Sequence, residues 1–144
     1  SKVQLELARI GFDNIVGVIV ADELPDALGQ MTQVSACDLR EWISTGQVTQ
    51  MVDVRTCGER KAAQIEESKH IPLPALANKQ SELDPGKPTV VLCGSGYRST
   101  IAASQLAAGG FAKVYNLMGG MVAWEGRNCG CFEPADMVYG GGGI

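Results

Sequence analysis

A cysteine, Cys93, stands between an apolar run and a polar loop that holds two glycines and an arginine. The segment from 90 to 101 reads VVLCGSGYRSTI. The apolar residues before Cys93 are typical of a buried strand, and the pattern after Arg98 is typical of a helix. In open parallel sheets, reactive groups collect at the carboxyl ends of the strands. Cys93 is therefore our candidate catalytic residue, a thiol placed to act as a nucleophile.

The residues that follow Cys93 favour a negative charge on its sulfur. Gly94 and Gly96 allow the backbone to curl until several N–H groups point inward, at the positive end of the following helix. Arg98 adds a fixed charge and a planar set of donors. Such surroundings lower a thiol pKa from about 8.5 into the range where the thiolate dominates at neutral pH. The candidate substrate-binding residues are Gly94, Ser95, Gly96, Tyr97, Arg98 and Ser99.

The same donors suit a small anionic substrate such as thiosulfate or a low-molecular-weight persulfide. Attack by the thiolate on the outer sulfur of that substrate leaves Cys93 as a persulfide, whose terminal sulfur then passes to a thiol or to cyanide. A thiolate has no proton to lose, so no general base is needed in a chain with one histidine, His70. We expect small sulfur-containing anions and thiols as partners and no cofactor apart from this covalent persulfide.

The composition excludes several other classes of protein. The chain has 144 residues, 45% of them hydrophobic, which is enough for one compact domain. A net charge of -4 and a pI near 4.9 argue against nucleic acid or an anionic membrane as a partner. The apolar runs fall short of the roughly 20 residues that span a bilayer, and the first residues show no secretory pattern. We expect a cytoplasmic protein.

The five cysteines are odd in number and lack the dense spacing of a disulfide-stapled domain, which favours reduced thiols. The one tight pair is Cys129 and Cys131, and His70 is distant from it in the sequence. We therefore expect no metal site. The cysteines are Cys37, Cys57, Cys93, Cys129 and Cys131.

Strand and helix patterns alternate from residue 31 onward, which indicates an α/β fold with a parallel sheet covered on both faces. Capping patterns at Ser35 and Thr56 each predict the start of a helix. The expected strands are 32–34, 48–54, 70–71, 89–92 and 113–117, and the other expected helices are 74–83, 99–108 and 121–125.

The first 22 residues repeat part of this pattern. Residues 7–19 align with 106–118 as a helix, a glycine and a strand, either by chance or because the chain begins in the last elements of a preceding similar unit. Because an apolar strand at 14–20 needs a partner, pairing with the domain edge or a homodimer through this strand is a hypothesis. We assign 1–22 to this remnant, 23–30 to a linker, 31–133 to the main domain and 134–144 to a flexible tail.

Three motifs in order resemble those of rhodanese-like sulfurtransferase domains, over about residues 31 to 130. The resemblance is closest to the modules fused behind metallo-β-lactamase-fold persulfide dioxygenases, some of which carry two rhodanese-like units. It implies such a fusion in the parent protein, with any iron in the dioxygenase, and a rhodanese-like α/β fold with about five parallel strands. The motifs are MVDVR with Glu59, CGSGYRS, and GFxxVxNLxGGMxAW, at 51–55, 93–99 and 110–124.

The resemblance also implies roles for individual residues. Cys93 would carry the persulfide and residues 94–98 would form its cradle. Asp53 and Arg55 would support that loop from the neighbouring strand, although an ordinary ion pair is the alternative. The residues that would shape and close the fold are Gly119, Gly120 and Trp124. The family pattern Gly-His-Ile is replaced here by Ala63-Gln64-Ile65, and the following Gly-Ala by Glu67-Ser68, which alters a turn remote from the cysteine.

Three questions stay open at this point. Cys57 follows the Asp53 strand and is either a resolving thiol for Cys93 or a passive residue. A cysteine-dependent phosphatase is a rival enzyme, but phosphatases place five residues between Cys and Arg, whereas four lie between Cys93 and Arg98. A non-catalytic binding module is the rival of a different class. The physiological sulfur donor and acceptor are not distinguished by the sequence.

Overall fold

The computed structural model describes residues 31–47 and 50–126 and contains one five-stranded parallel sheet. The strand order is β1-β5-β4-β2-β3, so the strand that leads to Cys93 is central. This confirms the expected α/β fold with five parallel strands. The expected elements at 1–22, the linker, the tail, Cys129 and Cys131 lie outside the described residues. The strands are β1 (Thr32–Val34), β2 (Gln50–Asp53), β3 (Lys69–His70), β4 (Thr89–Leu92) and β5 (Val114–Leu117).

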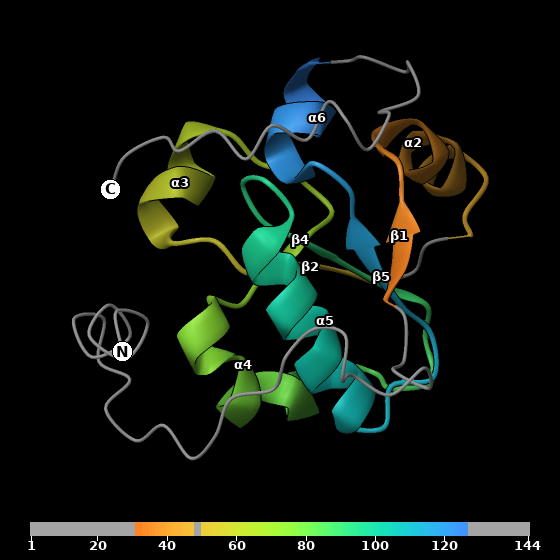
Figure 1. The fold of residues 1–144 in the computed structure, drawn as a ribbon, viewed down its shortest axis with the longest axis vertical. Coiled ribbons are helices and arrows are strands. Elements are labelled where there is room, and N and C mark those ends of the chain that lie inside the picture. Colours follow the sequence, from red (N-terminus) through yellow and green to blue (C-terminus); the bar gives the residue numbers. More distant parts are fainter. Residues whose placement is uncertain (1–30, 48–49, 127–144) are drawn as a thin grey trace, which may run out of the picture. The chain divides into compact units, whose positions relative to one another are not determined.

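Helices connect the strands and cover both faces of the sheet (Figure 1). The Ser35 side chain accepts a hydrogen bond from the Asp38 amide at the start of α2, and Thr56 and Glu59 form a full capping box at α3. Both predicted helix starts are confirmed. The helices are α2 (Ala36–Ser44), α3 (Cys57–Ala62), α4 (Leu73–Lys79), the 3-10 turn η2 (Gln80–Glu82), α5 (Tyr97–Ala108) and α6 (Gly120–Gly126).

Successive residues of β2 and β4 face opposite sides of the sheet and build two cores. Val52 and Val91 pack on one side with residues of α4 and α5, including Leu76 and Leu106. The other side packs against α2 and α6, and its buried members include Leu39, Met51, Val90, Leu92 and Met121. The strands β2 and β4 are therefore buried on both faces, which fixes the position of their carboxyl ends.

One boundary error lies at the start of α5. The sequence predicts this helix from Ser99, but it begins at Tyr97, because Gly96 adopts a left-handed conformation with φ of 97° and ends the loop early. Cys93 is thus separated from the helix by three residues. The short loop brings the first N–H groups of α5 close to the sulfur.

The remaining global expectations concern membranes, metals and thiols. Within the described ranges, no helix has the length and apolar character to cross a membrane. The same residues bring together no group of three or more His, Cys, Asp or Glu side chains suited to a metal ion. Cys57 and Cys93 are free thiols, whereas Cys37 is disulfide-bonded. The expectation of reduced cysteines is therefore wrong for Cys37.

Candidate active site

The Cys93 sulfur lies at the end of β4 and is surrounded by hydrogen-bond donors. The Gly96 backbone N–H donates to Sγ at 3.1 Å, and the Ser99 hydroxyl oxygen lies 3.3 Å from Sγ. The loop from 94 to 96 curls over the sulfur, so that the Cys93 side chain is fully buried. The inward-pointing N–H groups expected from the glycine spacing are therefore present, with the sulfur at their centre.

The first residues of α6 hold this loop from the other side. Met121 N–H donates to the Cys93 carbonyl at 2.8 Å, and Val122 N–H donates to the Gly94 carbonyl at 3.1 Å. The C=O and N–H of a trans peptide point in opposite directions, so these bonds turn the following N–H groups away from α6. A Cβ at Gly120 would overlap the Cys93 carbonyl and lie 2.7 Å from the Gly94 carbonyl carbon. Glycine at position 120 is required for this close approach.

These surroundings lower the pKa of Cys93 below the ordinary value for a thiol. Burial acts in the opposite direction and raises the pKa, because the thiolate loses its water. The hydrogen bond from the Ser99 hydroxyl, and those from the backbone N–H groups of Ser99, Ser95 and Gly96, lower the pKa by more. The loop therefore favours the thiolate in spite of its burial.

Arg98 is paired with a carboxylate. Its guanidinium donates to both Glu59 oxygens, with Nη1 at 2.9 Å from Oε2 and Nη2 at 2.5 Å from Oε1. The Arg98 hydrogen bonds lower the pKa of Glu59 far below its usual range, and the same contact raises the pKa of Arg98. We expected Arg98 to supply charge to the thiol and substrate. The bidentate pair with Glu59 also fastens the loop to α3, while the Arg98 charge still interacts with Cys93.

Asp53 and Arg55 form a buried ion pair at the carboxyl end of β2. Arg55 Nη2 lies 2.8 Å from Asp53 Oδ2, and Arg60 Nη1 donates to the same oxygen at 3.1 Å. Burial raises the pKa of Asp53, but the hydrogen bonds from the two arginines prevail and lower it. Arg55 also donates to the carbonyl of Glu59 at 3.3 Å. The pair therefore connects to the Cys93 loop indirectly, through Glu59 and then Arg98.

Comparison with known proteins decides the family. The family model for the rhodanese-like domain matches residues 35–127 of this chain, a range that includes most of the described residues.

The chain belongs to the rhodanese-like family.

Several relatives of this rhodanese-like domain carry sulfurtransferase names. The putative sulfurtransferase YtwF of Bacillus subtilis is 34% identical over 98 residues, which are 68% of this chain and 94% of YtwF. The thiosulfate sulfurtransferase GlpE of Pseudomonas savastanoi is 35% identical over 75 residues, 52% of this chain and 71% of GlpE. The chain spans about half, 51%, of another relative, the putative sulfur carrier protein YrkF of Bacillus subtilis, at 30% identity.

Solved structures agree with this assignment. The crystal structure of a rhodanese-like domain protein from Staphylococcus aureus matches with a TM-score of 0.62 and 28% identity. The match covers 65% of this chain and 91% of that protein. The five-stranded sheet and its helices are therefore those of a rhodanese-like fold.

The rim of the Cys93 loop carries exposed apolar side chains. Tyr97, the first residue of α5, is 70% exposed, and Val122 of α6 is 67% exposed. Ile101, one turn after Tyr97, is also exposed. Ser95 is exposed at the tip of the loop, whereas Ser99 is buried against the sulfur. The candidate residues 94–99 thus divide into an inner set around Sγ and an outer set facing solvent.

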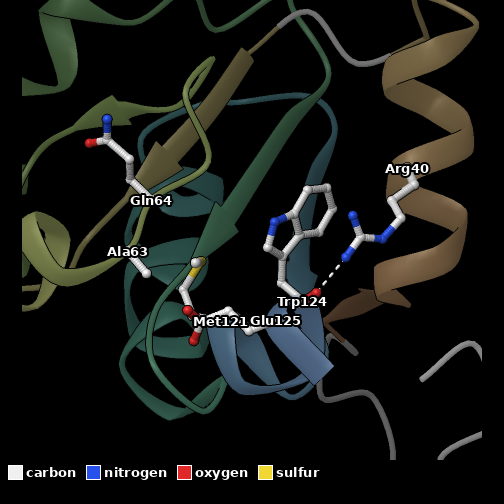
Figure 2. Close-up of a pocket in the computed structure, with 6 residues that line it drawn as sticks. All are labelled: Arg40, Ala63, Gln64, Met121, Trp124 and Glu125. Atoms are coloured by element: carbon white, nitrogen blue, oxygen red, sulfur yellow. Dashed lines mark hydrogen bonds between the residues drawn. The ribbon is translucent and has the colours of Figure 1, made fainter. Parts of the chain in front are cut away.

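A cavity of about 340 Å³ lies beside α6. Figure 2 shows the Arg40 guanidinium alongside the Trp124 ring, 3.9 Å from its centre, with a hydrogen bond to the Trp124 carbonyl. This contact ties α2 to α6 and so fixes the helix that holds the Cys93 loop. The residues that line the cavity are Arg40, Ala63, Gln64, Met121, Trp124 and Glu125.

Two residues of the rhodanese-like site were missed as site residues by the sequence reasoning. Glu59 was explained in the sequence by its place in the capping box of α3. The sequence therefore held no separate sign that Glu59 also pairs with Arg98. Asn116 occurs in the third motif, but nothing in the sequence shows that its side chain points from β5 towards Ser99.

Cys57 is exposed at the first residue of α3 and, like Cys93, is a free thiol. Its role as a resolving thiol stays a prediction.

Proposed function

We propose that this rhodanese-like domain is a sulfurtransferase in which Cys93 carries the transferred sulfur. The observation that supports the proposal most is the convergence of N–H and hydroxyl groups on Cys93 Sγ, which lowers the thiol pKa. A thiolate formed in this way is a nucleophile without a general base. The names of YtwF and GlpE support the same reaction class.

The proposed reaction has two displacements at sulfur. In the first, the Cys93 thiolate attacks the outer sulfur of thiosulfate, a Cys93 S–S bond forms, and sulfite leaves with the electron pair of the broken S–S bond. With a low-molecular-weight persulfide as donor, the thiolate of that molecule leaves instead. In the second, cyanide or a thiolate attacks the terminal sulfur, and Cys93 leaves as the thiolate. Thiocyanate or a new persulfide is the product.

The protein contributes to both steps by stabilising sulfur anions. Cys93 Sγ is the attacking anion in the first step and the leaving anion in the second, so donors such as the Gly96 N–H act in both. Arg55 and Arg98 are each paired with a carboxylate. An incoming anion is therefore bound mainly by backbone N–H donors, because the nearby arginine charges are already paired. Thiosulfate and an organic persulfide both stay as candidate donors.

Steady-state turnover tests the proposal. Thiosulfate is offered as donor with cyanide or glutathione as acceptor, and glutathione persulfide is offered with cyanide; thiocyanate or sulfite is measured. We expect the Cys93→Ser variant to lose turnover with every pair. Cys57→Ser is the matched control, since it removes the other free thiol of the described residues, and we expect it to keep turnover. Wild-type protein that turns over no donor would contradict the proposal.

A non-catalytic binding module is the second candidate function, favoured by one observation. The Cys93 side chain is fully buried, so a donor has no direct access to Sγ in this conformation. Titration of the Cys93 thiol with iodoacetamide, a small reagent, separates the two functions. A thiol that reacts in the native protein supports the enzyme, and one that reacts only in denaturant supports the binding module.

Three further proposals concern the parent protein. Fusion to a metallo-β-lactamase-fold domain and a homodimer through the strand at 14–20 rest on the sequence alone. A cytoplasmic location has the same basis. Light scattering of the purified chain tests the dimer, because a strictly monomeric species at high concentration would remove that hypothesis.

A further inference from the structure

The Ser99 hydroxyl lies between two acceptors. Its oxygen is 3.3 Å from Cys93 Sγ and 2.5 Å from Asn116 Oδ1, and all three side chains are buried. A hydroxyl has one hydrogen to donate. Ser99 can therefore donate to the sulfur or to the Asn116 carbonyl, but not fully to both.

The orientation of the Asn116 amide is fixed by its other contacts. Its Nδ2 lies 3.0 Å from Thr100 Oγ1 and 3.3 Å from the Gly96 carbonyl oxygen. Thr100 gives its own hydrogen to the Gly96 carbonyl at 2.8 Å, so both of these oxygens must accept from Asn116. A reversed amide would bring oxygen against oxygen at two places. The Asn116 carbonyl must therefore face Ser99.

We propose that Asn116 is a positioning residue whose side-chain carbonyl competes with the Cys93 sulfur for the one hydrogen of the Ser99 hydroxyl. When Sγ is neutral, Ser99 donates to Asn116 at the shorter distance. When Sγ is an anion, the hydrogen turns to the sulfur, and the buried Asn116 carbonyl loses its partner. Asn116 thereby limits how strongly Ser99 stabilises the thiolate.

This competition acts at both steps of the proposed reaction. Its consequence for turnover rests on the proposed function. The attacking thiolate holds the Ser99 hydrogen, whereas in the persulfide the charge moves to the terminal sulfur and the hydrogen returns to Asn116. A less stabilised thiolate has a higher pKa and is a stronger nucleophile. At a pH above the thiol pKa, Asn116 therefore favours loading of Cys93 with sulfur.

The charged groups around Cys93 are untouched by a change at Asn116. Arg98 of α5 faces the loop with its partner Glu59 of α3, and Asp53 lies at the end of β2 with its own arginine partners. Asn116 is neutral, and its side chain hydrogen-bonds to Gln33, Gly96, Ser99 and Thr100. A shift in the thiol pKa on its substitution would therefore act through the hydroxyl.

The pH dependence of iodoacetamide modification at Cys93, followed by peptide mass spectrometry, tests the proposal. We expect Asn116→Ala to lower the thiol pKa by roughly one unit, because the Ser99 hydrogen is released to the sulfur. Ser99→Ala should raise it. The double variant should equal Ser99→Ala alone. Gln33→Ala is the control, since it removes a contact at the opposite end of the Asn116 amide, and it should leave the pKa unchanged.

Two outcomes would overturn the proposal. One is an unchanged thiol pKa in a folded Asn116→Ala variant. The other is an equal shift with and without Ser99, since a merely structural effect does not need the hydroxyl. The thiol pKa is measured without any sulfur donor or acceptor, so failure here is distinct from failure of the proposed function, and the NMR titration below measures it where the native thiol does not react with iodoacetamide.

A measurement on wild-type protein covers the case in which Asn116→Ala does not fold. The NMR signals of the Asn116 side-chain amide should shift as the Cys93 thiol titrates, because the hydrogen bond to its carbonyl is lost. The same titration should leave them unchanged in Ser99→Ala. Signals that do not respond in the wild type would overturn the proposal.

Discussion

Substitution of Gly120 by alanine adds one methyl group, which should separate the Cys93 loop from α6. Its φ is +55°, and an added Cβ would overlap the carbonyls of Cys93 and Gly94. The left-handed conformation costs a non-glycine residue about 1–2 kcal/mol. Relief of the overlap breaks the two N–H bonds from Met121 and Val122, at about 1 kcal/mol each. We expect Gly120→Ala to lower the free energy of unfolding by about 3–4 kcal/mol.

Urea unfolding measures this loss, and Gly46→Ala is the matched control. Gly46 has a similar φ of +71°, but no atom lies within 4 Å of its added Cβ, so it should lose only about 1–2 kcal/mol. The rate of Cys93 modification at fixed pH should also change in Gly120→Ala and not in Gly46→Ala. Equal losses of stability in the two variants, with equal thiol reactivity, would refute the view that α6 holds the loop through this contact.

Three other predictions concern charge. Asp53→Asn should lower the free energy of unfolding by roughly 3–5 kcal/mol in urea, because two arginines lose a buried charged partner; a loss below 1 kcal/mol would contradict this. Glu59→Gln should raise kcat/KM for thiosulfate by roughly two- to tenfold at low salt, because Arg98 is left unpaired, and salt should reduce the gain; no gain at any salt concentration would count against the role of this pair. Turnover should rise with pH through a Cys93 pKa below the ordinary thiol value, since the thiolate is the reactive form; a rate that falls over that range would be inconsistent with thiolate attack.

The sequence predicts local features of the site well because their causes are local. The strand before Cys93, the glycine loop after it and the helix caps at Ser35 and Thr56 each depend on residues within a few positions. The lowered thiol pKa follows from the same loop. What Gly96 adds is a left-handed φ that starts α5 two residues early.

The contacts that complete the site join distant parts of the chain and leave little signal in it. Glu59 and Arg98 are 39 residues apart, and the sequence alone did not predict their pairing. Ser99 and Asn116 are 17 residues apart and meet because β5 lies beside β4. Such pairings depend on strand order and register, so they become visible only in the folded chain.

Peptide-resolved mass spectrometry after incubation with thiosulfate or glutathione persulfide tests the central claim most directly. We expect one added sulfur atom on the Cys93 peptide, which cyanide removes and which Cys93→Ser abolishes. Absence of added sulfur at Cys93 with both donors, or its appearance at Cys57 alone, would contradict the assignment of Cys93 as the sulfur carrier.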